Sequence, residues 1–195
     1  MKRLIAIATL LIVAGCSSSG SVTPGPTGPD PALVAKAHLA PCPRSSTSAV
    51  PDGLPNLTLD CLGEGPAVHL AGLTGKPTVV NLWGSWCGPC KEEASYLSTV
   101  SRQLRAQVRF LGIDIEDSDD NALTFDSTEV TPPVRYPSVV DPEKKALIAL
   151  HFPGPPETLL VNSAGTVVHT HPGKYDSAAA LRDDISRYLQ VRLAG

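Results

Sequence analysis

Two cysteines separated by two residues, in Trp86-Cys87-Gly88-Pro89-Cys90, have the types and spacing in this chain that most directly indicate chemistry. The apolar, largely β-branched run before them, residues 78–83, is typical of a strand buried on both faces of a sheet. Gly88 and Pro89 favour the start of a helix, because proline fixes a helical φ and loses no hydrogen bond in the first turn. The sequence therefore predicts that Cys87 lies at a helix N-terminus.

A cysteine in that position favours the thiolate, because the free amide groups and the helix dipole stabilise an anion. Two cysteines three apart on a first turn also lie within the distance that a disulfide requires. We interpret Cys87 as the more exposed nucleophile and Cys90 as the thiol that resolves a mixed disulfide. The expected chemistry is reversible disulfide exchange.

A structural disulfide or half of a zinc site are the alternatives for this pair. Zinc would need a second pair of ligands, and no other C-x-x-C and no H-x3-H occurs in the chain. The redox interpretation is therefore favoured, with neither a metal nor a cofactor.

The helix after the motif is expected to turn one face inward, formed by residues at spacings of three and four: Cys90, Glu93, Leu97, Val100 and Leu104. A carboxyl one turn below Cys90 would be desolvated and would hold its proton more strongly, so Glu93 could pass a proton to Cys90. The alternative is a Glu93 that reaches the surface and pairs with a basic residue. Periodicity alone does not separate the two.

The whole chain has 195 residues and is 42% hydrophobic, enough for one globular domain with appendages. Basic residues number 16 against 19 acidic ones, and no basic run follows residue 3, so nucleic acid is not an expected partner. Residues 1–15 read as an export signal, with Lys2 and Arg3 before a short apolar core.

The segment ending in Ala14-Gly15-Cys16 resembles the lipobox of bacterial lipoproteins. By that resemblance, Cys16 becomes the lipid-modified first residue of the mature chain, with stable attachment to the membrane. The alternative is an ordinary signal peptide that leaves Cys16 as a stray thiol. Residues 16–50, rich in Ser, Gly, Pro and Ala, are expected to form a flexible tether before a folded domain at residues 51–195.

Two further cysteines, Cys42 and Cys61, remain. In an exported protein they are expected to form a structural disulfide that pins the tether to the domain. The alternatives are two free thiols, or a second redox pair that reduces the first.

The remaining chain alternates strand and helix patterns, which predicts an α/β domain. An N-terminal ribbon is expected from residues 57–59 and 67–70, a buried strand at 108–115, and helices at about 118–126, 142–150 and 177–192, the first two capped by Ser118 and Asp141. A hairpin is expected to turn at residues 162–165. His169 and His171 would share one face of its second strand, but without a visible third ligand they read as surface histidines rather than a metal site.

The Trp-Cys-Gly-Pro-Cys motif after a buried strand, a later Pro156-x-Thr158-apolar segment and a terminal helix together resemble thioredoxin over residues 51–195. More narrowly, the N-terminal ribbon, Asn81 before the motif, Glu93 after it and the inserted unit at 108–128 resemble the TlpA/ResA-like and CcsX-like extracytoplasmic thiol-disulfide oxidoreductases. The resemblance implies a thioredoxin-like fold with a mixed sheet flanked by helices.

The resemblance also implies site residues. Pro156 would be a cis proline beside the disulfide that shapes the groove for a client, with Trp86, Gly88, Pro89 and Pro155 as its framework; Pro155 departs from the family pattern. A Gly-Pro dipeptide between the cysteines leans toward a reductase.

The activity implied is reduction of exported proteins at the outer face of the bacterial membrane by a monomer. Apocytochrome c is the favoured client, and a membrane thiol carrier of the CcdA/DsbD type would supply the electrons. A disulfide-forming oxidase is the nearest alternative, because sequence does not fix the direction. A peroxidase, a Sco-type metal-delivery protein and a binding-only module are more remote, since the cysteine spacing fits the first two poorly.

Overall fold

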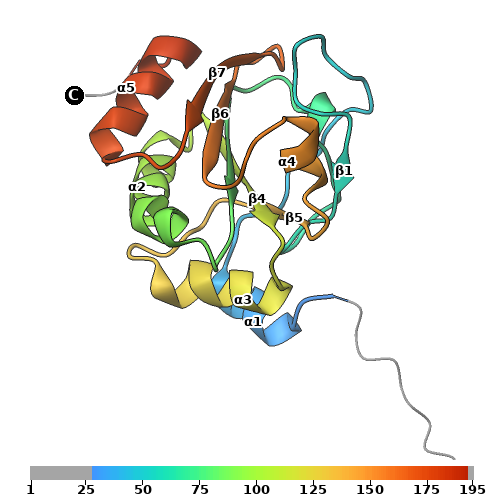
Figure 1. The fold of residues 1–195 in the computed structure, drawn as a ribbon, viewed down its shortest axis with the longest axis vertical. Helices are drawn as coiled ribbons and strands as arrows, with labels where there is room; N and C mark the ends of the chain where they lie inside the picture. The colour runs from blue at the N-terminus through green and yellow to red at the C-terminus, as the bar shows by residue number, and fades with distance from the viewer. Residues whose placement is uncertain (1–27, 193–195) are drawn as a thin grey trace, which may run out of the picture.

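A five-stranded mixed sheet forms the centre of the computed structural model, which describes residues 28–192 (Figure 1). Its strand order is β5-β4-β3-β6-β7. The parallel strands are β3 (Thr78–Trp83), β4 (Arg109–Ile115) and β5 (Ser138–Asp141), while β6 (Glu157–Val161) runs antiparallel to its neighbours β3 and β7 (Val167–Pro172). The expected mixed sheet is confirmed, and β3 lies at its centre with all six residues buried.

Helices α2 (Gly88–Leu104) and α5 (Ala178–Leu189) cover one face of the sheet (Figure 1). Alternation along β3 turns Val79, Asn81 and Trp83 toward that side, and Val79 packs with Leu97, Val100 and Ile185 there. The predicted inward face of α2 is buried along its whole length. This packing places the part of α2 around Leu97 and Val100 against the central strand β3.

The opposite face is covered by α4 (Lys145–Ala149), the short turn η1 (Leu70–Gly72) and the ribbon of β1 (Thr58–Leu59) and β2 (Val68–His69). Beyond the ends of β3 and β4 lie α1 (Pro31–Ala37), α3 (Asp119–Thr124) and the π-helical turn η2 (Phe125–Glu129) (Figure 1). Their apolar residues pack around Trp83 and the two cysteines of the motif.

The structure differs from the expected tether over residues 28–50. Ala37 on α1 is fully buried, the amide of Ala40 donates to the carbonyl of Arg135 at 2.8 Å, and that of Ser46 donates to the carbonyl of Gly72 at 3.2 Å. Composition alone suggested a chain too polar to pack, but a few apolar residues and backbone hydrogen bonds suffice to hold it. Residues 16–27 of the expected tether, Cys16 and the signal segment lie outside the described residues.

The helix expected from Pro142 begins instead at Lys145. The N-cap residue is therefore Lys144 and not the expected Asp141. The two carboxylate oxygens of Asp141 still accept from first-turn amides, from Lys145 at 2.9 Å and from Ala146 at 2.8 Å. Residues 142–144 form a turn in which Lys144 has a φ of 49°, a left-handed conformation that cannot continue a helix. Ser118 caps α3 as predicted. Ser177, expected as the first residue of the last helix, is instead the N-cap of α5.

No helix among residues 28–192 has the length and apolar character needed to cross a membrane.

Candidate active site

Cys87 and Cys90 form a disulfide at the N-terminus of α2, with a Cα–Cα distance of 5.3 Å. Cys87 is the N-cap residue, and its Sγ accepts from the amide of Cys90 at 3.2 Å. The same amide would stabilise a thiolate on Cys87 after reduction, as would the dipole of the 17-residue helix. The local sequence thus places the sulfur where its anion is favoured.

The two sulfurs are almost equally buried in this oxidised form, with Cys87 4% and Cys90 2% exposed. Cys87 was expected to be clearly more exposed than Cys90, but the observed difference is very small, because the segment at Pro155 lies against Cys87. The carbonyl oxygen of Pro155 lies 3.7 Å from Cys87 Sγ. Trp86 beside the pair is 53% exposed, and its Nε1 donates to the carbonyl of Ile115 at 2.9 Å. The exposed indole of Trp86, held by this hydrogen bond, offers an apolar surface next to the disulfide.

The peptide bond between Pro155 and Pro156 is cis. Glu157 directly after it begins β6, the neighbour of β3, so the sheet itself brings this segment beside the motif. The structure therefore unites Trp86, Cys87, Cys90 and the Pro155-Pro156 segment in one place.

Glu93 lies one turn below Cys90, is fully buried, and is held at both carboxyl oxygens. Asn81 Nδ2 donates to Oε1 at 2.9 Å, and the amide of Tyr175 donates to Oε2 at 2.8 Å. Burial raises the pKa of Glu93 to about 7, and the two hydrogen bonds and the charge of Lys174 oppose that rise. Of the two readings left open by periodicity, the buried carboxyl is the one observed.

A second buried carboxyl, which sequence reasoning missed, lies near the same sulfur. Asp126 in η2 is 2% exposed, and with Cys90, Asn81 and Tyr136 it lines a cavity of about 10 Å³, room for about one water molecule. Its Oδ2 has no hydrogen-bond partner, and burial raises its pKa well above the ordinary value. No periodic pattern marks this residue, because the turn that carries it is irregular.

Asp114 on β4 is a third such carboxyl. It lies beside Trp83 in the sheet, is 2% exposed, and leaves Oδ1 without a partner. Burial, with the nearby Asp117, Asp126 and Asp119, raises its pKa to about 9. An acidic residue inside the apolar run at 108–115 was a visible signal in the sequence.

Cys42 and Cys61, expected to pair, are joined by a disulfide with a Cα–Cα distance of 6.0 Å. The backbone of Cys61 forms an isolated antiparallel β-bridge with Val139 of the edge strand β5. Cys42 Sγ lies 3.5 Å from the carbonyl oxygen of Ser138. This disulfide therefore packs at the sheet edge, two strands from β3.

A cavity of about 430 Å³ opens at the other end of the sheet, near Lys76, Val108 and Arg109. These residues precede or begin β3 and β4, whereas the cysteines follow β3. A six-residue strand, about 20 Å long, separates the two ends. This cavity is not part of the disulfide site.

The fold and the site define a thioredoxin-like protein with a disulfide at a strand-to-helix junction. The Redoxin family model matches residues 49–185, and the chain belongs to that family. It is an oxidoreductase of the thiol-disulfide class.

Among curated relatives, the thiol:disulfide interchange protein DsbE homolog of Paracoccus denitrificans is 33% identical over 135 residues, 63% of this chain and 71% of the relative. The thiol-disulfide oxidoreductase ResA of Bacillus subtilis is 30% identical over 120 residues, 61% of this chain and 65% of ResA. A solved structure of a secreted thiol-disulfide isomerase from Corynebacterium glutamicum has the same fold, with a TM-score of 0.59 and 23% identity, covering 78% of this chain and 95% of that one.

Proposed function

We propose that the chain reduces disulfides of exported proteins at the outer face of the bacterial membrane, with apocytochrome c as the favoured client. The observation that carries this proposal is the Cys87–Cys90 disulfide at a helix N-terminus above the buried Glu93. The relatives named as a thiol:disulfide interchange protein and a thiol-disulfide oxidoreductase support the reaction class. The direction and the client rest on the family resemblance of the sequence.

The reaction begins with both cysteines reduced. The Cys87 thiolate attacks a client disulfide, forms a mixed disulfide and releases one client thiolate, which takes up a proton. Glu93, when ionised, accepts the Cys90 proton, directly or through a water. The Cys90 thiolate then attacks Cys87 Sγ and releases the second client sulfur as a thiolate, which takes up a proton from Glu93 or from solvent. Two electrons pass to the client, and the Cys87–Cys90 disulfide remains. A membrane thiol carrier of the CcdA/DsbD type would return the two electrons.

The exposed Trp86 and the Pro155-Pro156 segment are proposed to receive the client. Pro155 offers a carbonyl oxygen beside Cys87 Sγ, and a client strand could donate a backbone hydrogen bond to it. Pro156 lacks an amide hydrogen, so an incoming strand can pair there only in one way.

The test is to capture the client with Cys90→Ser. Without the resolving thiol, the mixed disulfide on Cys87 should persist and appear on non-reducing gels, with apocytochrome c identified by mass spectrometry. Cys87→Ser is the matched control and should capture nothing. Capture of many unrelated exported proteins, without apocytochrome c, would overturn the proposed client.

The direction is tested by trapping thiols in growing cells and measuring the potential of the Cys87/Cys90 couple. A reductase should be mainly reduced in cells and have a potential lower than that of the client disulfide. A mainly oxidised pair would show the disulfide-forming oxidase instead.

Attachment through a lipid on Cys16 is proposed from the lipobox resemblance. Mass spectrometry of the mature protein should find an acylated Cys16 at its N-terminus, and the protein should fractionate with membranes. A Cys16→Ala variant should lose both properties. An unmodified Cys16 in the mature chain would contradict the lipid anchor.

A further inference from the structure

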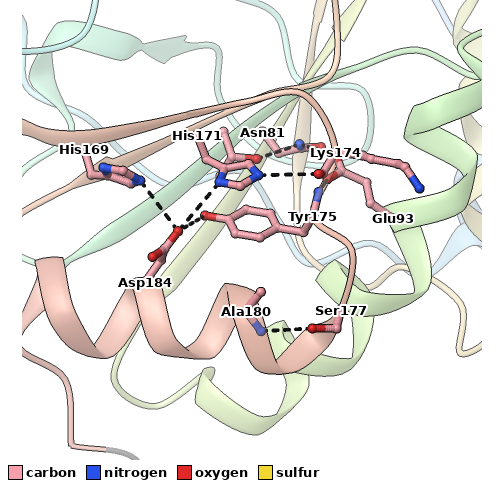
Figure 2. A network of polar contacts seen from close by, with 10 residues as sticks. Asn81, Glu93, His169, His171, Lys174, Tyr175, Ser177, Ala180 and Asp184 are labelled. Carbon is pink, nitrogen blue, oxygen red and sulfur yellow. Dashed lines mark hydrogen bonds and ion pairs between the residues drawn. The ribbon is translucent and has the colours of Figure 1, made fainter.

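Two histidines and an aspartate converge between strand β7 and helix α5 (Figure 2). The pairing of β7 with β6 turns His169 and His171 toward the face that α5 covers, and Asp184 comes from the second turn of that helix. Oδ2 of Asp184 lies 3.6 Å from Nε2 of His169 and 3.7 Å from Nδ1 of His171. One potential ligand atom from each of the three residues lies within 4.8 Å of the other two.

The hydrogen bond at the other ring nitrogen of His171 fixes how the ring meets the carboxylate. Nε2 lies 3.4 Å from the carbonyl oxygen of Lys174, which can only accept, so Nε2 carries the hydrogen. In the neutral ring, Nδ1 then presents a lone pair to Oδ2 of Asp184. A positive charge between these two atoms, either a proton on the ring or a bound cation, would satisfy both of them. No lysine or arginine among residues 28–192 forms an ion pair with Asp184.

We propose that His169, His171 and Asp184 bind a divalent transition-metal ion such as Zn²⁺. Two imidazole nitrogens and one carboxylate oxygen are a common zinc donor set, and tetrahedral ligands about 2.0 to 2.2 Å from the ion are about 3.3 to 3.5 Å apart. The distances from Asp184 Oδ2 to the two histidine nitrogens, 3.6 and 3.7 Å, exceed that spacing by only a few tenths of an ångström. All three side chains are partly exposed, so solvent can supply the fourth ligand.

The surrounding contacts hold Asp184 and His171 in place before an ion arrives. Tyr175 Oη donates to Asp184 Oδ2 at 3.1 Å, and the Lys174 carbonyl holds His171. The His171 ring stacks on Tyr175 with 3.8 Å between centroids. Metal-binding imidazoles and carboxylates are commonly oriented by outer hydrogen bonds of this kind.

The ion would join β7 to α5 across the loop at residues 173–177. That loop carries Tyr175, whose amide holds Glu93 (Figure 2). Because an ion that binds only the folded state stabilises it, Zn²⁺ should raise the melting temperature of the protein.

The test is a Zn²⁺ titration of the full chain, purified without a histidine tag. Both cysteine pairs are oxidised and Cys16 is alkylated, so that free thiols cannot bind the ion. Calorimetry should show one ion per chain. His169→Phe and His171→Phe keep an aromatic ring for stacking, and Asp184→Asn keeps an acceptor for Tyr175. Each should weaken binding at least about tenfold, the loss typical even for an outer-shell partner.

The matched control is His151→Asn, which removes an exposed histidine outside the cluster; asparagine tolerates its φ of 57°. It should bind Zn²⁺ as the wild type does, and Mg²⁺, which prefers oxygen ligands, should not compete. Should a variant fail to fold, Cu²⁺ broadening of the His169 and His171 ring signals in wild-type NMR spectra gives an independent readout. Absent Zn²⁺ binding, binding unchanged in all three variants, or unbroadened ring signals would overturn the proposal.

Discussion

Glu93 is a buried acid whose position suits proton transfer at neutral pH. Burial alone would keep it protonated, but the Asn81 amide and the Tyr175 backbone amide offset part of that cost and bring its pKa to about 7. An acid or base works best when its pKa is near the working pH. The two hydrogen bonds therefore tune Glu93 for its proposed role beside Cys90.

Replacement Glu93→Gln should slow the resolving step by about a hundredfold, the lower range for loss of a general base. The wild-type rate should rise as pH passes about 7, because Glu93 accepts the Cys90 proton only when ionised. The variant should lose that inflection. Glutamine still accepts the Tyr175 hydrogen bond, so the fold should persist. Stopped-flow kinetics of the reduced protein with a model disulfide across pH 5–9 would measure both effects.

Glu92→Gln is the matched control, one residue away and exposed. Its carboxylate pairs with Lys174 at the surface, 2.6 Å from Nζ, so its loss should leave the inflection in place. A Glu93→Gln variant with the wild-type pH profile would remove Glu93 from the mechanism.

At the scale of elements, regular periodicity predicted well and irregular backbone did not. The strand at 78–83 and the face of α2 from Cys90 to Leu104 followed from apolar spacing, because burial selects these residues directly. The turn at residues 142–144 did not, since proline after Asp141 suits both a helix start and a turn. Asp126 was missed for a similar reason, because a π-helical turn has no periodic signature.

The segment 28–50 shows how long-range contacts override composition. Its hydrogen bonds reach residues far along the chain, such as Arg135 and Gly72, which no local pattern reveals. The disulfide between Cys42 and Cys61 holds the end of this segment at β5. We propose that this disulfide is structural.

The double variant Cys42→Ala/Cys61→Ala should lower the free energy of unfolding by about 3 kcal/mol, because the disulfide closes a loop of about 19 residues in the unfolded chain. Urea unfolding would measure the loss. The variant's disulfide-exchange activity with a model substrate should remain near that of the wild type, since Cys87 and Cys90 are intact. Lost activity in a stably folded variant would favour the alternative of a second redox pair.

Cys87→Ala/Cys90→Ala is the comparison for stability. Its cysteines are only three residues apart, so the same reasoning gives a loss of about 1.5 kcal/mol. Equal losses in the two double variants would show that loop closure does not set the stability.

At the scale of the whole molecule, the site is assembled from segments distant in sequence. The motif identified Cys87 and Cys90, and a helical spacing pointed to Glu93. Asp184 was not recognised as a partner of His169 and His171, because it meets them only through the packing of α5 on β7. A sequence shows which residues share an element, whereas contacts between elements depend on the complete fold.

The buried acids also make the stability of the whole fold depend on pH. Unfolded, Glu93 and Asp114 would lose their protons near pH 4, but in the folded protein they hold them to about pH 7 and 9. Folding is therefore favoured most below about pH 4 by these groups, and their contribution is lost as pH rises through the folded pKa values. The free energy of unfolding should fall between pH 5 and 9.

Asp114→Asn removes the carboxyl whose pKa is raised to about 9. The free energy of unfolding of the variant, relative to that of the wild type, should therefore increase by about 1.4 kcal/mol per pH unit in that range. Urea unfolding of both oxidised proteins at pH 5, 7 and 9 would measure this slope, and parallel profiles would mean that Asp114 is ionised in the folded protein.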